Sequence, residues 1–193
     1  MISKELFGVI AVVISLGTYL PYYAGLLKGE TKPHVFSWIV WSLILTITCA
    51  AQITKGAGAG AWITVLETLG SSGIALFALF AGEKNITRSD WFFFCGALTA
   101  IPLWAVTGDP LASAMLVTCI GVASFWPTVR KSWQQPGDEV AVTYILSGPA
   151  YACSLLALEK VTLAAAFYPA VFMVVNAAFG IMLLARRQIQ IGR

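Results

Sequence analysis

Long apolar runs alternate with short polar segments along the whole chain. A helix that crosses a bilayer needs roughly 20 mostly apolar residues. Seven runs come close to that length or exceed it, at about residues 6–27, 35–54, 61–82, 91–108, 111–130, 140–158 and 162–185. Backbone N–H and C=O groups cannot stay unpaired in hydrocarbon, and the alternating pattern of a barrel strand is absent. The pattern therefore predicts an all-α membrane protein with seven transmembrane helices.

The composition agrees with a membrane setting. Hydrophobic residues make up 59% of the chain and charged residues only 11%, whereas soluble domains average about 25% charged residues. The formal net charge of +3 needs no nucleic acid to explain it, because basic residues beside transmembrane helices act as topology signals. We therefore expect the lipid bilayer to surround the chain, and we expect no nucleic-acid partner.

The basic residues also predict the orientation, since Lys and Arg in short loops stay on the cytoplasmic side. Seven helices place the two termini on opposite sides of the membrane. One side would then hold Lys28, Lys32, Lys84, Arg88, Arg130, Lys131, Arg186, Arg187 and Arg193, and the other would hold Lys4, Lys55 and Lys160. This imbalance predicts an external N-terminus, a cytoplasmic C-terminus and a multi-pass protein of the plasma (inner) membrane.

A shift of the chain by 106 residues indicates an internal repeat. It aligns "TYLPYYAGLLKGETKPHVFSWI" (18–39) with "SFWPTVRKSWQQPGDEVAVTYI" (124–145), and Pro21 with Pro127. The same shift places the third apolar run on the seventh, and many transporters are built from duplicated units of this kind. We expect a 3+1+3 arrangement with two parallel repeats. Its parts are a first triple-helix repeat at 1–82, a linker helix at 83–110 and a second triple-helix repeat at 111–193.

These features resemble the SWEET and PQ-loop (MtN3-like) transporter superfamily, whose bacterial half-size members are the SemiSWEETs. The resemblance rests on Pro21 and Pro127 in the PQ positions and on Ser37 and Thr143 after the following loop. The stretch "VNAAFGIML" (175–183) is similar to the Asn-x-x-x-Gly stretch of the family. The resemblance covers nearly the whole chain and implies transport of a sugar through a central cavity.

The chain also departs from the family pattern. The glutamine of the PQ pair is replaced by Tyr22 in the first copy and by Thr128 in the second. The asparagine is present in the second copy only. The solute is therefore expected to be small and polar, either a sugar or an amino-acid-like molecule such as those carried elsewhere in the superfamily.

Glu67 is the one charged side chain well inside an apolar run. An ionised carboxylate at that depth costs several kcal/mol, so it must face water, pair with another group or take up a proton. Burial favours the protonated form, which makes Glu67 the candidate residue for proton coupling. The alternative is a protonated glutamic acid that bonds to a neighbouring Ser, Thr or Tyr for structural reasons alone.

Four further residues complete the predicted substrate-binding site. Asn176 lies near the middle of the last run, where it either binds a solute or forms an interhelical hydrogen bond. Gly70 is its counterpart under the shift, and Glu67 stands three residues before Gly70, on the same helix face. Trp38 and its counterpart under the shift, Tyr144, are the other two expected substrate-binding residues. Trp38 and Trp41 lie one turn inside the second run, where they either line the inner vestibule or belong to the aromatic belt at the membrane interface.

Prolines inside the runs predict hinges. Pro21, Pro127 and Pro149 each remove a backbone donor and interrupt the helix locally. Such bends would let two three-helix units rock around a central site, as in alternating access. Static kinks that help packing are the alternative.

The sequence therefore predicts a membrane transporter of a small polar solute, active as a monomer or a homo-oligomer. Facilitated diffusion and a proton-coupled PQ-loop exporter or symporter that uses Glu67 are both open, as is a receptor or scaffold that does not transport. No motif for catalysis, metal binding or a cofactor is evident, so an enzyme is not expected.

Overall fold

The computed structural model describes residues 3–83, 85–107 and 110–191. The chain is 86% helical, and no strand lies in this described part. The α-helices are α1 (Lys4–Leu27), α2 (Val35–Thr54), α3 (Trp62–Ala81), α4 (Arg88–Thr107), α5 (Pro110–Ala123), α6 (Phe125–Gln134), α7 (Ala141–Ala157) and α8 (Leu163–Ile191), with 3₁₀ turns η1 (Gly58–Ala61) and η2 (Pro136–Asp138). The prediction of an all-α protein is confirmed.

The predicted number of seven helices is wrong, because the described residues form eight. The fifth predicted run, 111–130, is divided into α5 and α6 at Ser124. Pro127 explains the division, since a proline has no N–H to donate to the carbonyl four residues earlier and its ring clashes there. That carbonyl belongs to Ala123, the last residue of α5. Pro127 itself lies in the first turn of α6, where a missing N–H costs nothing.

Within the described residues, three helical segments are long and apolar enough to span a membrane. They are Lys4–Leu27, Gly58–Ala81 and Leu163–Gln190. Two shorter apolar helices cover Val35–Ala50 and Ala141–Ala157. α5 falls short because of the break at Ser124. This length and composition are those of a membrane protein, although the predicted seven full spans are not all present.

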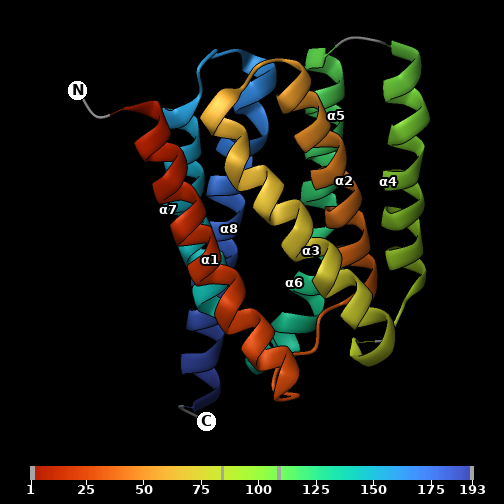
Figure 1. Ribbon diagram of the computed structural model, residues 1–193. Helices are drawn as coiled ribbons and strands as arrows, with labels where there is room; N and C mark the ends of the chain where they lie inside the picture. The colour runs from red at the N-terminus through yellow and green to blue at the C-terminus, as the bar shows by residue number, and fades with distance from the viewer. Residues whose placement is uncertain (1–2, 84, 108–109, 192–193) are drawn as a thin grey trace.

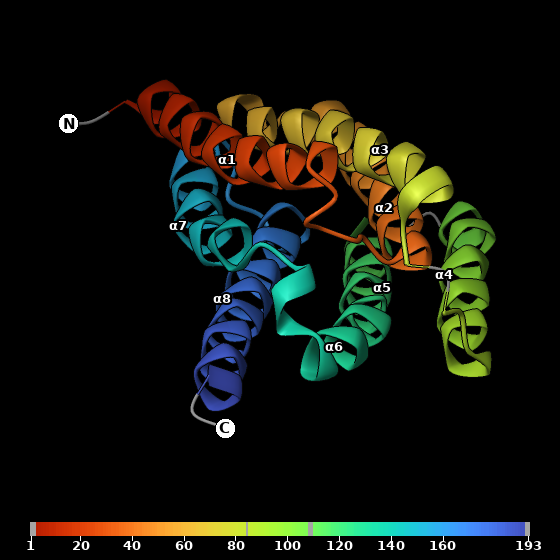
Figure 2. The same cartoon turned by 90° about the horizontal axis from the view of Figure 1, so that it is seen from below.

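The helices stand roughly alongside one another and run between two ends of the molecule (Figure 1). α1 packs on α3 and α7, α5 packs on α2 and α8, and the pairs α2–α3 and α7–α8 are also in contact. α4 packs on α5 and α2 at the edge of the bundle (Figure 2). The N-terminus lies at one end and the C-terminus at the other (Figure 1).

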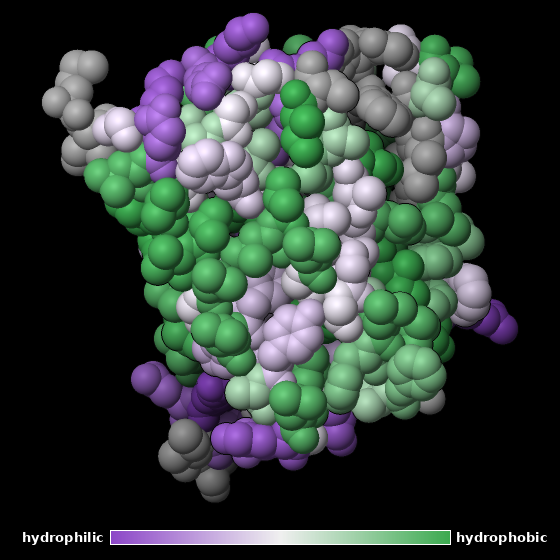
Figure 3. Space-filling model, in the orientation of Figure 1, coloured by the Kyte–Doolittle hydropathy of each residue, from purple (hydrophilic) through white to green (hydrophobic). Residues whose placement is uncertain are grey.

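The two ends differ in charge. We call the end with the C-terminus the basic end, because Lys28, Lys32, Arg88, Arg130, Lys131, Arg186 and Arg187 lie in its loops and helix ends. We call the other end the N-terminal end, where the basic residues of the described chain are Lys4, Lys55 and Lys160. Between the ends the surface facing the viewer in Figure 3 is mostly hydrophobic. Large apolar side chains such as Leu20, Leu69 and Ile181 are each at least 65% exposed on the surface of the molecule.

Small residues close the N-terminal end. η1 packs against α1 and α7, and Ala57, Ala59 and Ala61 are each no more than 3% exposed. A methyl group added to Gly60 would lie 2.7 Å from a side-chain carbon of Leu158. Ser154 of α7 donates a hydrogen bond of 3.1 Å to the carbonyl of Gly60. Close backbone approach therefore fills the space beside Gly60, and the ammonium of Lys4 donates hydrogen bonds to the carbonyls of Leu158 and Glu159 at the same end.

Candidate functional site

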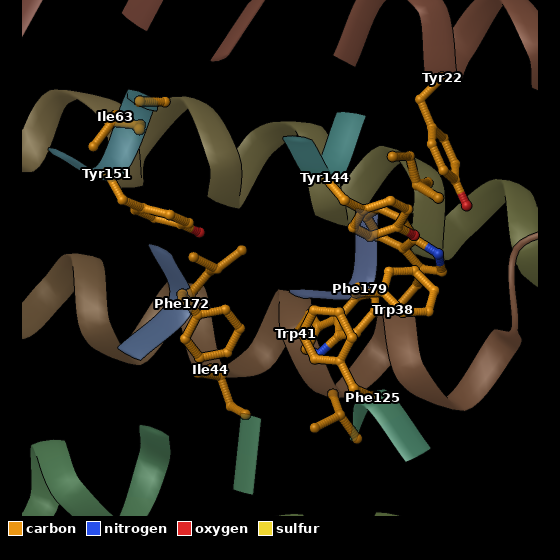
Figure 4. Close-up of a cluster of buried hydrophobic side chains, with 14 of the residues drawn as sticks. Tyr22, Trp38, Trp41, Ile44, Ile63, Phe125, Tyr144, Tyr151, Phe172 and Phe179 are labelled. Atoms are coloured by element: carbon orange, nitrogen blue, oxygen red, sulfur yellow. The ribbon is translucent and has the colours of Figure 1, made fainter. Parts of the chain in front are cut away.

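Aromatic side chains fill the space between two groups of helices, α1 to α3 and α5 to α8 (Figure 4). Trp38 and Trp41 of α2 contact each other with ring centroids 5.1 Å apart. Phe125 of α6 lies 4.5 Å from Trp41, and Phe179 of α8 lies 4.5 Å from Tyr144 in an edge-on arrangement. Edge-to-face and tilted contacts of this kind fix ring positions as well as burying area. The interior is therefore occupied by rings that meet from both groups of helices.

Glu67 lies on α3 toward the N-terminal half of this interior and is 4% exposed. Its Oε2 accepts a hydrogen bond of 3.0 Å from the hydroxyl of Tyr151 on α7. It forms no ion pair within the described part of the chain. Tyr168 of α8 packs against the ring of Tyr151, with centroids 6.1 Å apart. The sequence analysis gave a Ser, Thr or Tyr hydroxyl as one alternative partner of Glu67 but did not identify Tyr151.

Gly70 lies beneath the ring of Tyr19, one turn of α3 after Glu67. A methyl group there would lie 2.5 Å from a ring carbon of Tyr19. The Tyr19 hydroxyl lies 2.8 Å from Ser71 Oγ and donates to the backbone carbonyl of Glu67 at 3.2 Å. The hydroxyl of Tyr23 donates to the carbonyl of Gly70 at 2.7 Å. Gly70 therefore lets α1 approach α3 closely.

Asn176 is 6% exposed on α8. Its Nδ2 donates a hydrogen bond of 2.8 Å to the carbonyl of Phe172, one turn earlier on the same helix. The amide is therefore held by its own helix, in the stretch that also carries the ring of Phe172 against Tyr168 and Tyr151.

Trp38 and Tyr144, which the shift pairs, both lie in the buried cluster toward the basic end (Figure 4). Trp38 packs against Tyr22 with ring centroids 5.0 Å apart. Its Nε1 is buried and has no hydrogen-bond partner among the described residues. The Tyr144 hydroxyl donates to Oε2 of Glu139 at 2.9 Å. The two aromatic residues thus belong to one polar and aromatic cluster.

Glu139 is the functional candidate that sequence reasoning missed. It is 1% exposed, and its Oε2 accepts a second hydrogen bond, of 3.0 Å, from the hydroxyl of Tyr22 on α1. Its Oε1 pairs with the ammonium of Lys131 on α6, and Arg187 of α8 donates to its backbone carbonyl. Charged side chains in a polar loop are normally solvated, so the segment "QQPGDEVAVTY" did not predict that Glu139 is buried.

A third buried carboxylate, Asp90, fixes α4 at the basic end. Its Oδ2 accepts hydrogen bonds from Arg130 at 2.9 Å and from the N–H of Thr87 at 2.7 Å. His34, fully buried before α2, has its Nε2 3.6 Å from the same oxygen. Burial lowers the pKa of His34 to about 4, although Asp90 opposes this shift. The imidazole is therefore neutral at pH 7.

Hydroxyl groups form a matched pair of bonds between the helices. Ser37 of α2 donates to the carbonyl of Ser124 at 2.8 Å, and Thr143 of α7 donates to the carbonyl of Thr18 at 2.8 Å. Positions 37 and 143 are 106 residues apart, as are positions 18 and 124. Thr128 donates to the hydroxyl oxygen of Ser37 at 2.9 Å. The bonds are thus reciprocal under the shift found in the sequence.

The three prolines predicted as hinges occupy two kinds of position. Pro21 lies inside α1 and Pro149 inside α7, where each removes a backbone hydrogen bond of its helix. Pro127 stands just after the division between α5 and α6. Tyr22 and Tyr144, both bonded to Glu139, lie on α1 and α7, the helices that contain Pro21 and Pro149.

No family model, curated protein or solved structure matches this chain.

Proposed function

We propose that this chain is a membrane transporter that moves a small polar solute by alternating access between a first half, α1–α3, and a second half, α5–α8. The observation that carries the proposal is the hydrogen bond between Glu67 and Tyr151. It joins a buried carboxylate of a candidate membrane-spanning helix to a hydroxyl of the other half. Ionisable side chains inside a membrane protein mark solute or proton pathways, and transporters bind their solutes where two repeats meet.

The packing supports two related halves. Three helix contacts have a counterpart under the shift, and all six contacts are present. The contact of α1 with α3 corresponds to that of α5 with α8, the contact of α2 with α3 to that of α7 with α8, and the contact of α1 with α7 to that of α5 with α2. The reciprocal bonds of Ser37 and Thr143 support the same relation. We infer a 3+1+3 plan in which α4 is the linker and the first helix of the second repeat is divided into α5 and α6. These features suit a PQ-loop or SWEET-like transporter.

The solute we propose is a sugar or an amino-acid-like molecule, on the family resemblance of the sequence. Two hydroxyl groups, from Ser71 and Tyr151, and the amide of Asn176 lie on helices that line the aromatic interior. With most of the basic residues at one end, the positive-inside rule favours a cytoplasmic basic end and an external N-terminal end.

Proton-coupled transport is a second candidate, favoured by the partner of Glu67. A tyrosine hydroxyl can donate to an ionised carboxylate and can also stay bonded when the carboxyl group is protonated. Glu67 has no cation to hold it permanently ionised within the described part of the chain. Protonation would therefore change the charge of the interior without removing this partner.

Solute flux into proteoliposomes tests the proposal. We expect uptake of at least one member of a panel of sugars and amino acids, and a pH gradient will drive accumulation if Glu67 couples protons. Glu67→Gln should then abolish the response to the gradient, whereas Glu30→Gln, which removes an exposed carboxylate, should not. Gradient-independent flux that survives Glu67→Gln identifies facilitated diffusion. Binding without flux of any solute identifies a receptor and refutes transport.

A further inference from the structure

We infer that Tyr22, Lys131 and Glu139 form the gate at the basic end of the molecule. This inference rests on the proposed alternating access, which requires a closure at each end that can open. Glu139 and Lys131 are buried, at 1% and 8% exposure, and both come from the second half. Two of their hydrogen bonds cross to the first half: Tyr22 donates to Glu139 Oε2 at 3.0 Å, and Lys131 Nζ donates to the carbonyl of Lys32.

Opening the basic end affects the hydrogen bonds within the second half differently from those that join the two halves. The Lys131–Glu139 ion pair and the bond from Tyr144 to Glu139 join α6, α7 and the segment between them. They can persist while the halves move apart. The Tyr22 bond and the Lys32 contact must break if the basic end is to open. The ion pair is therefore a preformed binding site for the hydroxyl of Tyr22 and the carbonyl of Lys32, both from the first half.

Desolvation makes this closure reversible. Burying two charges costs several kcal/mol per ion, and their attraction repays this only when further hydrogen bonds satisfy them. Here the hydroxyl of Tyr22 and the carbonyl of Lys32 complete that set. When the end opens, water replaces both partners and hydrates the charges. An apolar closure would have no such compensation on opening, because its surfaces would meet water unfavourably.

The position of the pair allows movement. Lys131 lies on α6, a helix of 10 residues that is separated from α5 at Ser124. Ser132, next to Lys131, is fully buried, and its hydroxyl has no partner among the described residues. Ser132 is therefore a suitable position for a reporter cysteine, since the substitution is small and breaks no bond that the structure describes.

Two tyrosines provide a matched test, because Tyr22 and Tyr144 donate to the same oxygen of Glu139 at nearly equal distances. Tyr22→Phe removes the bond that crosses between the halves, whereas Tyr144→Phe removes one that stays within the second half. In a background without native cysteines, we would measure the rate at which Ser132→Cys reacts with a water-soluble maleimide. A second reporter, Thr64→Cys, monitors a residue that is 2% exposed near the N-terminal end of α3.

We expect Tyr22→Phe to accelerate labelling at position 132 about tenfold, the effect of losing one hydrogen bond to a charged group. Tyr144→Phe should change that rate less than about twofold, because the crossing bond remains. Labelling at position 64 should not accelerate in either variant. Glu139→Gln provides a second disruption of the gate and should accelerate labelling at position 132 as well.

Equal acceleration by the two tyrosine variants would overturn the inference, since the cluster would then be a simple structural bond network. Acceleration at both reporter positions would also overturn it, because it would mean general loosening. The inference would also be overturned if neither Tyr22→Phe nor Glu139→Gln accelerated labelling at position 132. The labelling needs no solute, so the expected pattern in a protein without flux would refute transport while leaving the closure itself established.

Discussion

Single residues set how closely the helices approach in the half of the molecule that holds Glu67. The ring of Tyr19 fills the space where a side chain at position 70 would lie. The same glycine offers its carbonyl to Tyr23, so two tyrosines of α1 are fixed against one turn of α3. The backbone of Glu67 is bonded by Tyr19 while its carboxylate is bonded by Tyr151. The position of that carboxylate therefore depends on a residue that has no side chain.

Gly70→Ala is expected to destabilise the protein by about 1–3 kcal/mol, because the added methyl group would overlap the Tyr19 ring. Gly17→Ala is the matched control, since an added methyl group at Gly17 meets nothing within 4 Å. In that variant the better helix propensity of alanine should leave stability unchanged or raise it. Thermal unfolding of the purified proteins in detergent compares them, and equal melting temperatures would contradict the packing role of Gly70.

His34 predicts a dependence of stability on pH. Burial lowers its pKa to about 4 in the folded protein, from an unperturbed value of 6.5. Asp90 and Glu83 favour protonation, and Lys131 and Arg130 oppose it. Between pH 6.5 and 4 the unfolded chain therefore binds more protons than the folded protein. The contribution of His34 therefore makes stability greatest above pH 6.5 and lowers it as the pH falls, by up to about 3 kcal/mol near pH 4.

Melting temperatures of the wild type and of His34→Phe across this pH range isolate the histidine contribution. The other titratable groups are the same in both proteins. We expect the wild type to lose stability more steeply below pH 6.5 than the variant. Parallel curves would show that His34 does not contribute.

At the scale of elements, α6 depends on α8. A helix of 10 residues is too short to be stable alone. Arg186 of α8 donates two hydrogen bonds, of 3.1 and 2.8 Å, to the carbonyl of Trp133, and its guanidinium lies 4.5 Å from the centre of that indole ring. Gln190 donates to the carbonyl of Gln134. Side chains of one helix thus satisfy the carbonyls that the end of another leaves unpaired.

Arg186→Ala should therefore loosen α6. We expect amide hydrogen exchange in α6 to increase about tenfold, the effect of losing roughly 1.4 kcal/mol of local stability. Gln188→Ala, an exposed change on the same helix, should leave this exchange unchanged. Mass spectrometry of peptides from α6 provides the measurement. If the amides of α6 were equally protected from exchange in Arg186→Ala and Gln188→Ala, the other contacts of α6 would be sufficient to hold it.

The elements also show what could be predicted from the sequence. Apolar runs of helical length predicted helices, because backbone pairing allows few other structures in hydrocarbon. The shift by 106 residues paired Ser37 with Thr143, and their hydrogen bonds are reciprocal. The division at Ser124 was missed. Pro127 leaves the carbonyl of Ala123 without its usual donor, but Pro21 and Pro149 do the same inside α1 and α7 without dividing them, so a proline alone does not predict a division.

The burial of Glu139 could not be predicted in the same way. Its partners are Tyr22, Lys131 and Tyr144, and the first of these is 117 residues away in the chain. Local patterns predict which residues share a helix face, but they do not predict which loop folds back between two helices. Glu67 was recognisable because its own surroundings in the sequence were apolar, whereas those of Glu139 were polar.

At the scale of the whole molecule, the uneven distribution of basic residues predicts a fixed orientation in the membrane. In intact cells expressing variants without native cysteines, Val161→Cys should react with an impermeant maleimide added outside. Val161 is 76% exposed at the N-terminal end, between α7 and α8. Glu30→Cys, exposed at the basic end, should react only after the cells are opened. The reverse pattern would invert the proposed topology.

The closure of the N-terminal end by small residues has a consequence for how this protein can change during evolution. Ala59 and Gly60 are fitted against neighbouring backbone and Leu158, and none of the ion pairs among the described residues lies at this end. Only a change of size can disturb such a fit, and a compensating change must restore volume. At Glu139 and Lys131 a change of charge matters most, and its compensation must restore charge balance. In homologous chains, substitutions at the N-terminal end should therefore occur in pairs that conserve the total side-chain volume. Substitutions at the basic end should occur in pairs that conserve the charge balance.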